Sequence, residues 1–471
     1  MPFAREPRPE TSKSLSGASP IPFWLDDPSK PESTLSLQDS ISADLVIVGA
    51  GFTGLWAALL AKEADPSREV MLLEAEQVGS GASGRNGGFM EASLTHGFFN
   101  GFSRWPKEMS AITAMGYSNL EEIEATVRRF GIDCDFIHSG ELLVATEPYQ
   151  VEDLRSAPKE AAAFGEKYEW MGREQIQLLV NSPIYRGALY DPRVVMVNPA
   201  RLAWGLRKAC LDTGVQLYEN TPATQLEEDG KSIQVQTTHG SVRAAKVALA
   251  TNAYTPLLKE ISNYMVPVYD YALMTEPLSA AQRAEIGWQA RQGISDTANQ
   301  FHYYRMTEDG RILWGGYDAV YYKNNGVGQQ YDANQESFGL LAEHFFETFP
   351  QLEGLRFTHA WGGAIDTCSR FSVFWGTAHG GRTAYAAGYT GLGVAASRFG
   401  AQIMLDLLDH RDNERTRLSM VREKPVPFPP EPMRSWVVEM TRRSLDQADR
   451  NHGHRNLWLR TLDSMGLGYD S

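Results

Sequence analysis

Residues 44–54 read DLVIVGAGFTG, and this stretch decides the fold class of the chain. Its apolar start ends at Gly49, which is typical of a buried parallel strand, and the Ala- and Leu-rich segment 55–63 then favours a helix. Residues 70–74 predict a second buried strand, so segment 44–74 makes a βαβ unit of the usual size, 31 residues. The sequence therefore predicts an α/β fold with a Rossmann-like first domain.

The glycines of this stretch follow the G-x-G-x-x-G pattern between a strand and a helix. Gly49 permits the tight turn, Gly51 lets the backbone approach a pyrophosphate at the positive end of the helix, and Gly54 lets helix and strand pack closely. Glu74 lies twenty residues beyond Gly54, where a carboxylate accepts hydrogen bonds from a ribose. This context predicts a dinucleotide site; the alternative is a glycine-rich turn that binds nothing.

Two further glycine-rich segments follow along the chain. Residues 79–88, GSGASGRNGG, suit a loop that wraps a pyrophosphate or a flat ring, and Arg85 is a candidate for pairing with phosphate. Residues 388–393, GYTGLG, precede a predicted helix over 394–408, whose positive end favours negative charge. The alternatives are a flexible surface loop for the first segment and a ligand-free turn for the second.

Composition bounds the function and the cellular location. The net charge is −14, from 44 Lys and Arg against 58 Asp and Glu, and it disfavours nucleic-acid binding because phosphates need clustered cations. Cys134, Cys210 and Cys368 lie far apart, so we expect no disulfide framework, no bound metal and reduced thiols, as in the cytoplasm. The first forty residues lack the apolar core of a secretory signal, and glycines interrupt the apolar stretch 45–61, so we expect no membrane span.

The length of 471 residues suits about two to three domains. Segment 224–250 predicts a strand meander, Asn198 and Pro199 begin a helix, and 383–387 predicts a strand.

We expect the second domain to be α+β, to be built on a mainly antiparallel sheet and to be inserted twice into the first. The predicted parts are an N-terminal arm (1–40), a first domain (41–95, 195–260 and 360–410), a second domain (96–194 and 261–359) and a tail (411–471) whose prolines break any helix. Phe23, Trp24 and Leu25 are expected to dock the arm onto the body.

These motifs, in this order, resemble the family of FAD-dependent oxidoreductases that includes D-amino acid oxidase, glycine oxidase and sarcosine oxidase. The chain is most similar to the γ-glutamylputrescine oxidase branch. The resemblance covers residues from about 40 to 435 and rests on segments 83–88, 250–254, 304–305, 310–311, 315–316, 388–393 and 427–430.

The resemblance implies FAD lying extended on the first domain, with its ring facing the second. It implies FAD contacts at Gly49, Gly51, Phe52, Thr53, Gly54, Glu74, Ala75, Ser83, Gly84, Arg85, Asn86, Gly87, Gly88, Ala223, Thr251, Asn252, Gly388, Gly391, Leu392 and Gly393. Some relatives link FAD covalently through a Cys, but Gly362 stands near that place and Cys368 falls several residues later. Others use a His where this chain has Arg85 and Asn86, so we expect non-covalent FAD.

The resemblance also implies oxidation of a primary or secondary amine that carries an anionic group to an imine, then to an aldehyde or keto acid. Hydride passes to flavin N5, and O₂ is reduced to H₂O₂. An apolar, aromatic pocket lowers the pKa of an amine, so no dedicated base is needed and no catalytic residue is assigned. Arg305 is the candidate anchor for the anion, and Tyr303, Tyr304 and Trp361 are candidate pocket walls. The alternative places Arg305 on the surface beside Glu308.

Two other functions stay open at this point. One is a flavoprotein dehydrogenase that passes electrons to a carrier instead of O₂, and the other is a non-catalytic flavin-binding subunit. No H-E-x-x-H or G-x-S-x-G motif occurs, so neither a zinc peptidase nor an α/β-hydrolase is supported. The sequence leaves the oligomeric state open.

Overall fold

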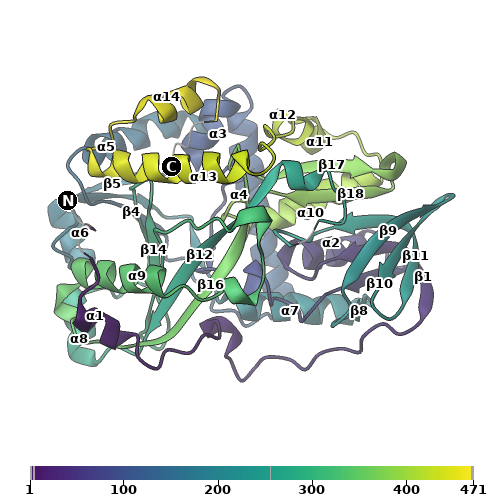
Figure 1. Cartoon of the computed structure of the whole chain (residues 1–471), viewed down its shortest axis with the longest axis horizontal. Helices are drawn as coiled ribbons and strands as arrows, with labels where there is room; N and C mark the ends of the chain where they lie inside the picture. The colour runs from purple at the N-terminus through teal and green to yellow at the C-terminus, as the bar shows by residue number, and fades with distance from the viewer. Residues whose placement is uncertain (1–2, 4–5, 255, 468–471) are drawn as a thin grey trace.

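The computed structural model of this protein describes residues 3, 6–254 and 256–467. Two large sheets dominate it, with β1 and β8–β11 on the right of Figure 1 and β4, β12, β14 and β16 towards the left. The outermost residues of the predicted arm and tail, 1–2, 4–5 and 468–471, lie outside the described residues.

The first sheet contains the predicted βαβ unit. In β1, Val48 pairs in parallel with Leu73 of β2 on one side and Leu249 of β11 on the other. The predicted strands 44–48, 70–74 and 383–387 and the meander 224–250 are confirmed. In spatial order the sheet comprises β17 (Phe374–Ala378), β18 (Thr383–Ala387), β11 (Ser241–Leu249), β1 (Ser40–Val48), β2 (Val70–Leu73) and β8 (Gln216–Tyr218), and β10 (Ser232–Thr237) and β9 (Ala223–Asp229) extend it from β11.

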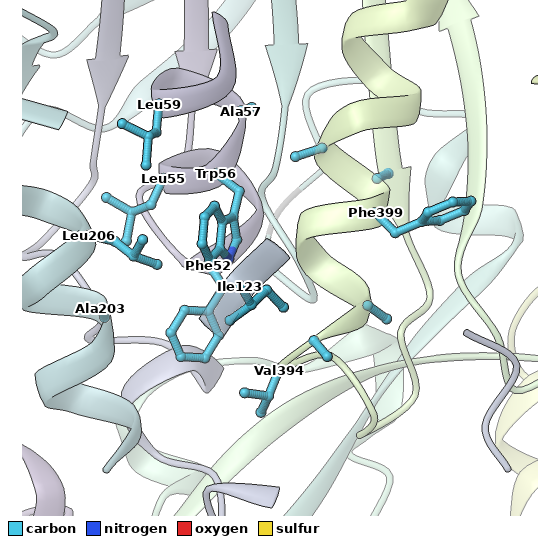
Figure 2. Packing of buried hydrophobic residues seen from close by; sticks show 14 of the residues in the cluster. Phe52, Leu55, Trp56, Ala57, Leu59, Ile123, Ala203, Leu206, Val394 and Phe399 are labelled. Carbon is cyan, nitrogen blue, oxygen red and sulfur yellow. The ribbon is translucent and has the colours of Figure 1, made fainter. Parts of the chain in front are cut away.

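Helices α2 (Phe52–Ala64) and α10 (Ala396–Leu408) pack against this sheet, and α7 (Pro199–Asp212) packs against α2. Figure 2 shows α2 between the other two, with Leu55 and Trp56 in the shared core. The Asn198 side chain accepts a hydrogen bond from the Arg201 backbone N–H, which confirms the predicted N-cap of α7. Helix α10 begins at Ala396, two residues later than predicted.

The second sheet is antiparallel except where β13 and β4 pair in parallel, which confirms the mainly antiparallel expectation. The predicted domain boundary at residue 360 falls inside β16, which pairs with β12 along almost its whole length. In spatial order the strands are β16 (Phe357–Cys368), β12 (Met265–Thr275), β15 (Ile312–Gly316), β14 (His302–Met306), β13 (Gly293–Asp296), β4 (Glu141–Ala145), β6 (Gly187–Asp191) and β5 (Glu169–Gly172).

Further short strands and helices complete this half of the molecule. Strands β3 (Phe89–Met90) and β7 (Val195–Met196) pair with each other, apart from both large sheets. The helices are α3 (Phe98–Arg104), α4 (Met109–Phe130), α5 (Gln150–Ala161), α6 (Arg173–Leu179), α8 (Ala280–Ile286) and α9 (Gln335–Thr348).

The two ends of the chain are more ordered than the sequence indicates. The arm contains α1 (Pro9–Ser14), and the buried Trp24 docks as expected, its Nε1 donating to the Asn86 carbonyl at 2.9 Å. The expectation that prolines break any helix in the tail is wrong, because they all precede Met433. The tail forms α11 (Glu414–Arg417), α12 (Ser419–Arg422), α13 (Met433–Arg450) and α14 (Leu457–Ser464), and α13 crosses the upper left of Figure 1, below α14.

Candidate active site

A cavity of about 1660 Å³ is lined by residues from both sheets and from the C-terminal helix α13. One part follows the glycine turns of the first sheet, and another follows the face of the second sheet. Val437, Thr441 and Leu445 of α13 also line it, at positions that share one side of the helix. The tail is therefore part of the site.

The glycines of the first motif are needed for close approach. A Cβ at Gly49, where φ is +100°, would lie 2.5 Å from the Ala250 carbonyl oxygen. A Cβ at Gly54 would lie 1.8 Å from the Gly49 carbonyl oxygen, so this glycine lets α2 pack close to β1. Gly49, Gly51, Phe52 and Thr53 line the cavity where α2 begins, whereas Gly54 lies behind it. This positive helix end suits a pyrophosphate.

Glu74 stands directly after β2 and lines the cavity beside Ala75 and Ala223. Its Oε2 accepts a hydrogen bond from the Ala50 backbone N–H at 2.7 Å, and its Oε1 accepts one from the Glu76 backbone N–H at 3.0 Å. Burial raises the pKa of Glu74, and these two backbone hydrogen bonds oppose that shift. The carboxylate is thus fixed at the place where the sequence predicts ribose binding.

The loop 79–88 folds back onto the start of α2. Ser83 Oγ accepts a hydrogen bond from the Phe52 backbone N–H at 2.9 Å, and Asn86 Oδ1 accepts one from the Gly88 N–H at 2.8 Å. Arg85, a candidate phosphate partner, instead pairs with Asp332 at 2.6 Å. Of the predicted contacts in this loop, Ser83, Arg85, Asn86 and Gly87 line the cavity, and Gly84 and Gly88 do not.

A buried carboxylate that sequence reasoning missed holds the third glycine turn. Asp366 on β16 accepts hydrogen bonds from the backbone N–H groups of Gly388 at 2.7 Å and Tyr389 at 3.2 Å. Burial raises the pKa of Asp366 to about 7. The turn is joined to α2 because Thr53 Oγ1 donates to the Tyr389 hydroxyl at 2.9 Å. Its predicted FAD contacts Gly391, Leu392 and Gly393 line the cavity, as do Thr251 and Asn252, and Gly388 does not.

Cys368 is buried beside this turn. Its Sγ donates hydrogen bonds to the carbonyl oxygens of Ser372 at 3.2 Å and Gly388 at 3.4 Å. Burial raises the pKa of this thiol, so it is held in the protonated form, which is the weaker nucleophile. These contacts support the expectation of non-covalent FAD.

The second sheet brings Tyr303 and Asp270 together in the cavity. The Tyr303 hydroxyl donates to Asp270 Oδ2 at 2.6 Å, and both side chains line the cavity. Burial raises the pKa of Asp270 to about 6, against the opposing effect of the Tyr303 hydrogen bond. A Cβ at Gly87 would lie 2.8 Å from the Tyr303 ring, so this tyrosine faces the loop of the first domain. Trp361 lines the same cavity and donates from Nε1 to the Arg85 carbonyl at 3.0 Å.

Tyr304 and Arg305 do not line the cavity. The Tyr304 hydroxyl pairs with that of Tyr185 at 2.7 Å, in the core on the other side of β14. Arg305 is 1 % exposed, which rules out the surface alternative. Its Nη1 donates to the Val197 carbonyl at 2.6 Å, and its Nη2 lies 3.4 Å from Asp135 Oδ2. These groups hold the guanidinium away from the cavity. The structure therefore does not place Arg305 where it could anchor an anionic group of the substrate.

The family model described as DAO, FAD dependent oxidoreductase, matches residues 44–407. This chain belongs to that family. The FAD-dependent oxidoreductase is 31 % identical over 386 residues to gamma-glutamylputrescine oxidoreductase of Escherichia coli strain K12, covering 79 % of this chain and 85 % of that protein. It is 29 % identical over 403 residues to an oxidoreductase named OrdL in Haemophilus influenzae, covering 82 % and 86 % respectively.

Solved structures support the fold of this FAD-dependent oxidoreductase. Glycine oxidase from Geobacillus kaustophilus matches with a TM-score of 0.65 and 21 % identity, over 81 % of this chain and 99 % of that one. L-proline dehydrogenase from P. horikoshii matches with the same TM-score and 18 % identity, over 80 % and 96 %.

The observed residues fit the FAD that the family uses. The cavity runs past the glycines at the start of α2 to the fixed carboxylate of Glu74, and it also reaches the glycine turn 388–393. Within the described part of the chain, no group of three or more His, Cys, Asp and Glu side chains is arranged to hold a metal ion. Nor does any described helix combine the length and apolar composition needed to cross a membrane.

Proposed function

We propose that this FAD-dependent oxidoreductase oxidises a primary or secondary amine to an imine, which water then converts to an aldehyde or keto acid. The observation that carries the proposal is that one cavity joins the glycines predicted to contact FAD to the Tyr303–Asp270 pair. The name of the gamma-glutamylputrescine oxidoreductase relative supports an amine-containing substrate.

Bound FAD supplies the acceptor for the hydride that leaves the carbon next to nitrogen. That hydride leaves only from the neutral amine, because the nitrogen lone pair must be free to form the C=N bond. The aromatic side chains of Tyr303 and Trp361 line the cavity, displace water and disfavour the charged ammonium form. The protein thereby lowers the pKa of the bound amine.

The sequence predicts that no dedicated base is needed, but the cavity holds Asp270, which takes the proton that the ammonium loses, at Oδ2. This oxygen already accepts the hydrogen bond from Tyr303, which fixes the direction of the carboxylate. The Tyr271 backbone N–H donates to Oδ1 at 2.8 Å and fixes the other oxygen. A general base works best when its pKa lies near the working pH, and burial brings Asp270 to about 6.

O₂ is the proposed electron acceptor. The balanced reaction consumes the amine, O₂ and water and releases the carbonyl product, ammonia or a primary amine, and H₂O₂. Stopped-flow mixing of the reduced enzyme with air-saturated buffer tests this part. Rapid recovery of the oxidised flavin spectrum with stoichiometric H₂O₂ supports an oxidase, whereas slow recovery identifies a dehydrogenase that uses a carrier.

The proposed reaction is tested by an anaerobic substrate panel. Amino acids, N-methyl amino acids, γ-glutamyl amines, diamines and polyamines are mixed with the holoenzyme, and the flavin absorbance is followed. We expect bleaching by at least one amine class, with a rate that rises with pH. Bleaching only by hydroxy acids or NADH would overturn the proposal.

A further inference from the structure

A row of polar side chains crosses the second sheet along the face that lines the cavity. Tyr303 of β14 lies opposite Ser295 of β13, and Ser295 Oγ donates to Glu141 Oε1 of β4 at 2.6 Å. Glu141 in turn lies opposite Asp191 of β6. Directly opposed residues point to the same face of a sheet, and all four line the cavity. The row therefore leads from the Tyr303–Asp270 pair to the end of the cavity where the carboxyl groups of Glu141 and Asp191 lie.

The carboxylates at this end differ: the charge and the backbone N–H of Arg193 stabilise the ionised form of Asp191, whereas no cation among the described residues acts in this way on Glu91 or Glu141. Glu141 is 5 % exposed and accepts its hydrogen bond from the neutral hydroxyl of Ser295. Glu91, just beyond β3, also lines the cavity. Burial, and then the charges of Glu141 and Asp191, raise the pKa of Glu91. Across the described ranges, neither Glu91 nor Glu141 forms an ion pair, and Glu91 accepts no hydrogen bond.

The positive charges elsewhere in the cavity are already paired. Asp and Glu side chains outnumber Arg side chains in the lining, where the Arg residues are Arg85, Arg442 and Arg455. Their partners are, respectively, Asp332 at 2.6 Å, Glu439 at 3.2 Å and Asp463 at 2.7 Å. Buried carboxylates without a partner are costly unless they are protonated or meet a cation. The lining thus favours a cationic occupant over an anionic one.

We propose that the Glu91–Glu141 end of the cavity binds a second, positively charged nitrogen of the substrate, so that the substrate class is diamines and polyamines. This inference rests on the proposed amine oxidation and replaces the anionic group expected from the sequence. The ring of Tyr168 lines this part of the cavity beside Phe99 and supplies aromatic surface that suits an alkyl ammonium.

The strand order sets the spacing of the two nitrogens. Strands β14 and β4 are separated only by β13, and Ser295 pairs with Leu143 on β4, so Tyr303 and Glu141 lie two strand steps apart across the sheet and two residues apart along it. At about 4.8 Å per step and about 3.3 Å per residue, this separation is about 12 Å. An extended chain advances about 1.1 Å per bond, because a strand rises about 3.3 Å over its three backbone bonds per residue. The reacting nitrogen lies at Asp270, across β15 from Tyr303 and away from Glu141, so we expect at least about eleven bonds between the oxidised nitrogen and the second cation.

The binding test uses probes that the enzyme cannot oxidise. Two trimethylammonium groups joined by a ten-carbon chain form the dication, and decyltrimethylammonium is the matched monocation. Each is titrated into the holoenzyme while the flavin spectrum is recorded, with calorimetry as a second readout. We expect the dication to bind at least tenfold more tightly. Glu141→Gln and, separately, Glu91→Gln should remove most of that difference, and the exposed Glu121→Gln should not.

The kinetic test compares kcat/KM for 1,10-diaminodecane with that for decylamine. We expect the ratio to fall about tenfold in Glu141→Gln and Glu91→Gln, mainly through KM of the diamine. Equal binding of the two probes by the wild-type enzyme, or an unchanged ratio in both variants, would overturn the dication site while amine oxidation still stands. If the dication binds more tightly than the monocation but no amine bleaches the flavin, the proposed amine oxidation is wrong and the cation site is still supported.

Discussion

Tyr303 reaches Asp270 across an intervening strand, and their side chains meet at 2.6 Å. Tyr303 lies on β14 and Asp270 on β12, with β15 between them. The contact is possible because the residue of β15 opposite Tyr303 is Gly315. A Cβ added at this position would lie 2.7 Å from the tyrosine ring. A glycine with no catalytic role of its own thus lets the tyrosine orient the proposed base.

Asp270→Asn should remove the low-pH limit on flavin reduction. The pKa of Asp270 is raised to about 6, so the carboxylate is protonated below that pH and accepts no further proton. In the wild-type enzyme, the anaerobic reduction rate should therefore fall as the pH drops through 6. The variant should lose this inflection and react about 10²–10⁴-fold more slowly at pH 8. Stopped-flow absorbance measures both effects; an unchanged profile would exclude Asp270 as the base.

Tyr303→Phe should move the same inflection above pH 6. The Tyr303 hydrogen bond favours the ionised form of Asp270, so its loss raises the pKa of the carboxyl. Tyr304→Phe is the matched control, because that hydroxyl pairs with Tyr185 in the core and not with Asp270. A shift in the control as large as that in Tyr303→Phe would argue for a general effect on the sheet.

Glu74→Ala should weaken FAD binding by about 1–3 kcal/mol, the range for lost hydrogen bonds to a charged group. The change removes the acceptor for the proposed ribose contact and for the Ala50 and Glu76 backbone N–H groups. Titration of the apoprotein with FAD, followed by fluorescence, measures the affinity. Glu69→Ala, at an exposed position before β2, provides the control. Equal affinities in the two variants would remove Glu74 from the site.

Gly391→Val should abolish FAD retention or flavin reduction. Gly391 has φ +92° and lines the cavity, so a β-branched side chain is strained there and enters the proposed flavin contact. Gly354→Val is a matched control, since Gly354 has φ +91° and a Cβ there would meet nothing within 4 Å. Gly354→Val introduces similar backbone strain at a position outside the cavity. Normal flavin content and turnover in Gly391→Val would show that the turn 388–393 does not contact the flavin.

Arg305→Ala should destabilise the protein without changing the dissociation constants of anionic amines. Loss of the charged hydrogen bond to the Val197 carbonyl should cost about 1.5–3 kcal/mol. Thermal unfolding measures this loss, and Arg356→Ala, at a largely exposed ion pair, is the control. A selective increase in the dissociation constant of anionic amines would instead return Arg305 to the substrate site.

Acid precipitation should release yellow FAD into the supernatant. The thiol of Cys368 is buried, donates to two backbone carbonyl groups and has a raised pKa, so it is poorly suited to attack a flavin. A yellow pellet would show a covalent link, and peptide mapping would then locate it.

The local sequence was sufficient to predict strands β1 and β2 of the first sheet. A strand, a glycine turn and a helix in direct succession are recognisable because backbone conformation, apolar burial and chain spacing are short-range properties. Segments 44–48 and 70–74 accordingly form β1 and β2, and the Asn198–Pro199 start of α7 is equally readable. The charged tail is an exception: its prolines predict no helix there, yet segment 433–450 follows the last of them and forms α13.

The sequence by itself determined the α/β class, the FAD family and the glycine motifs, all of which depend on neighbours along the chain. Only the tertiary structure decided which side chains meet in the cavity. Tyr303, Tyr304 and Arg305 are consecutive, yet one lines the cavity, one enters the core and one is held by Val197 and Asp135. Strand pairing brings Asp270 and Glu141 to the same face from distant positions, because register and burial depend on partners that no local pattern specifies.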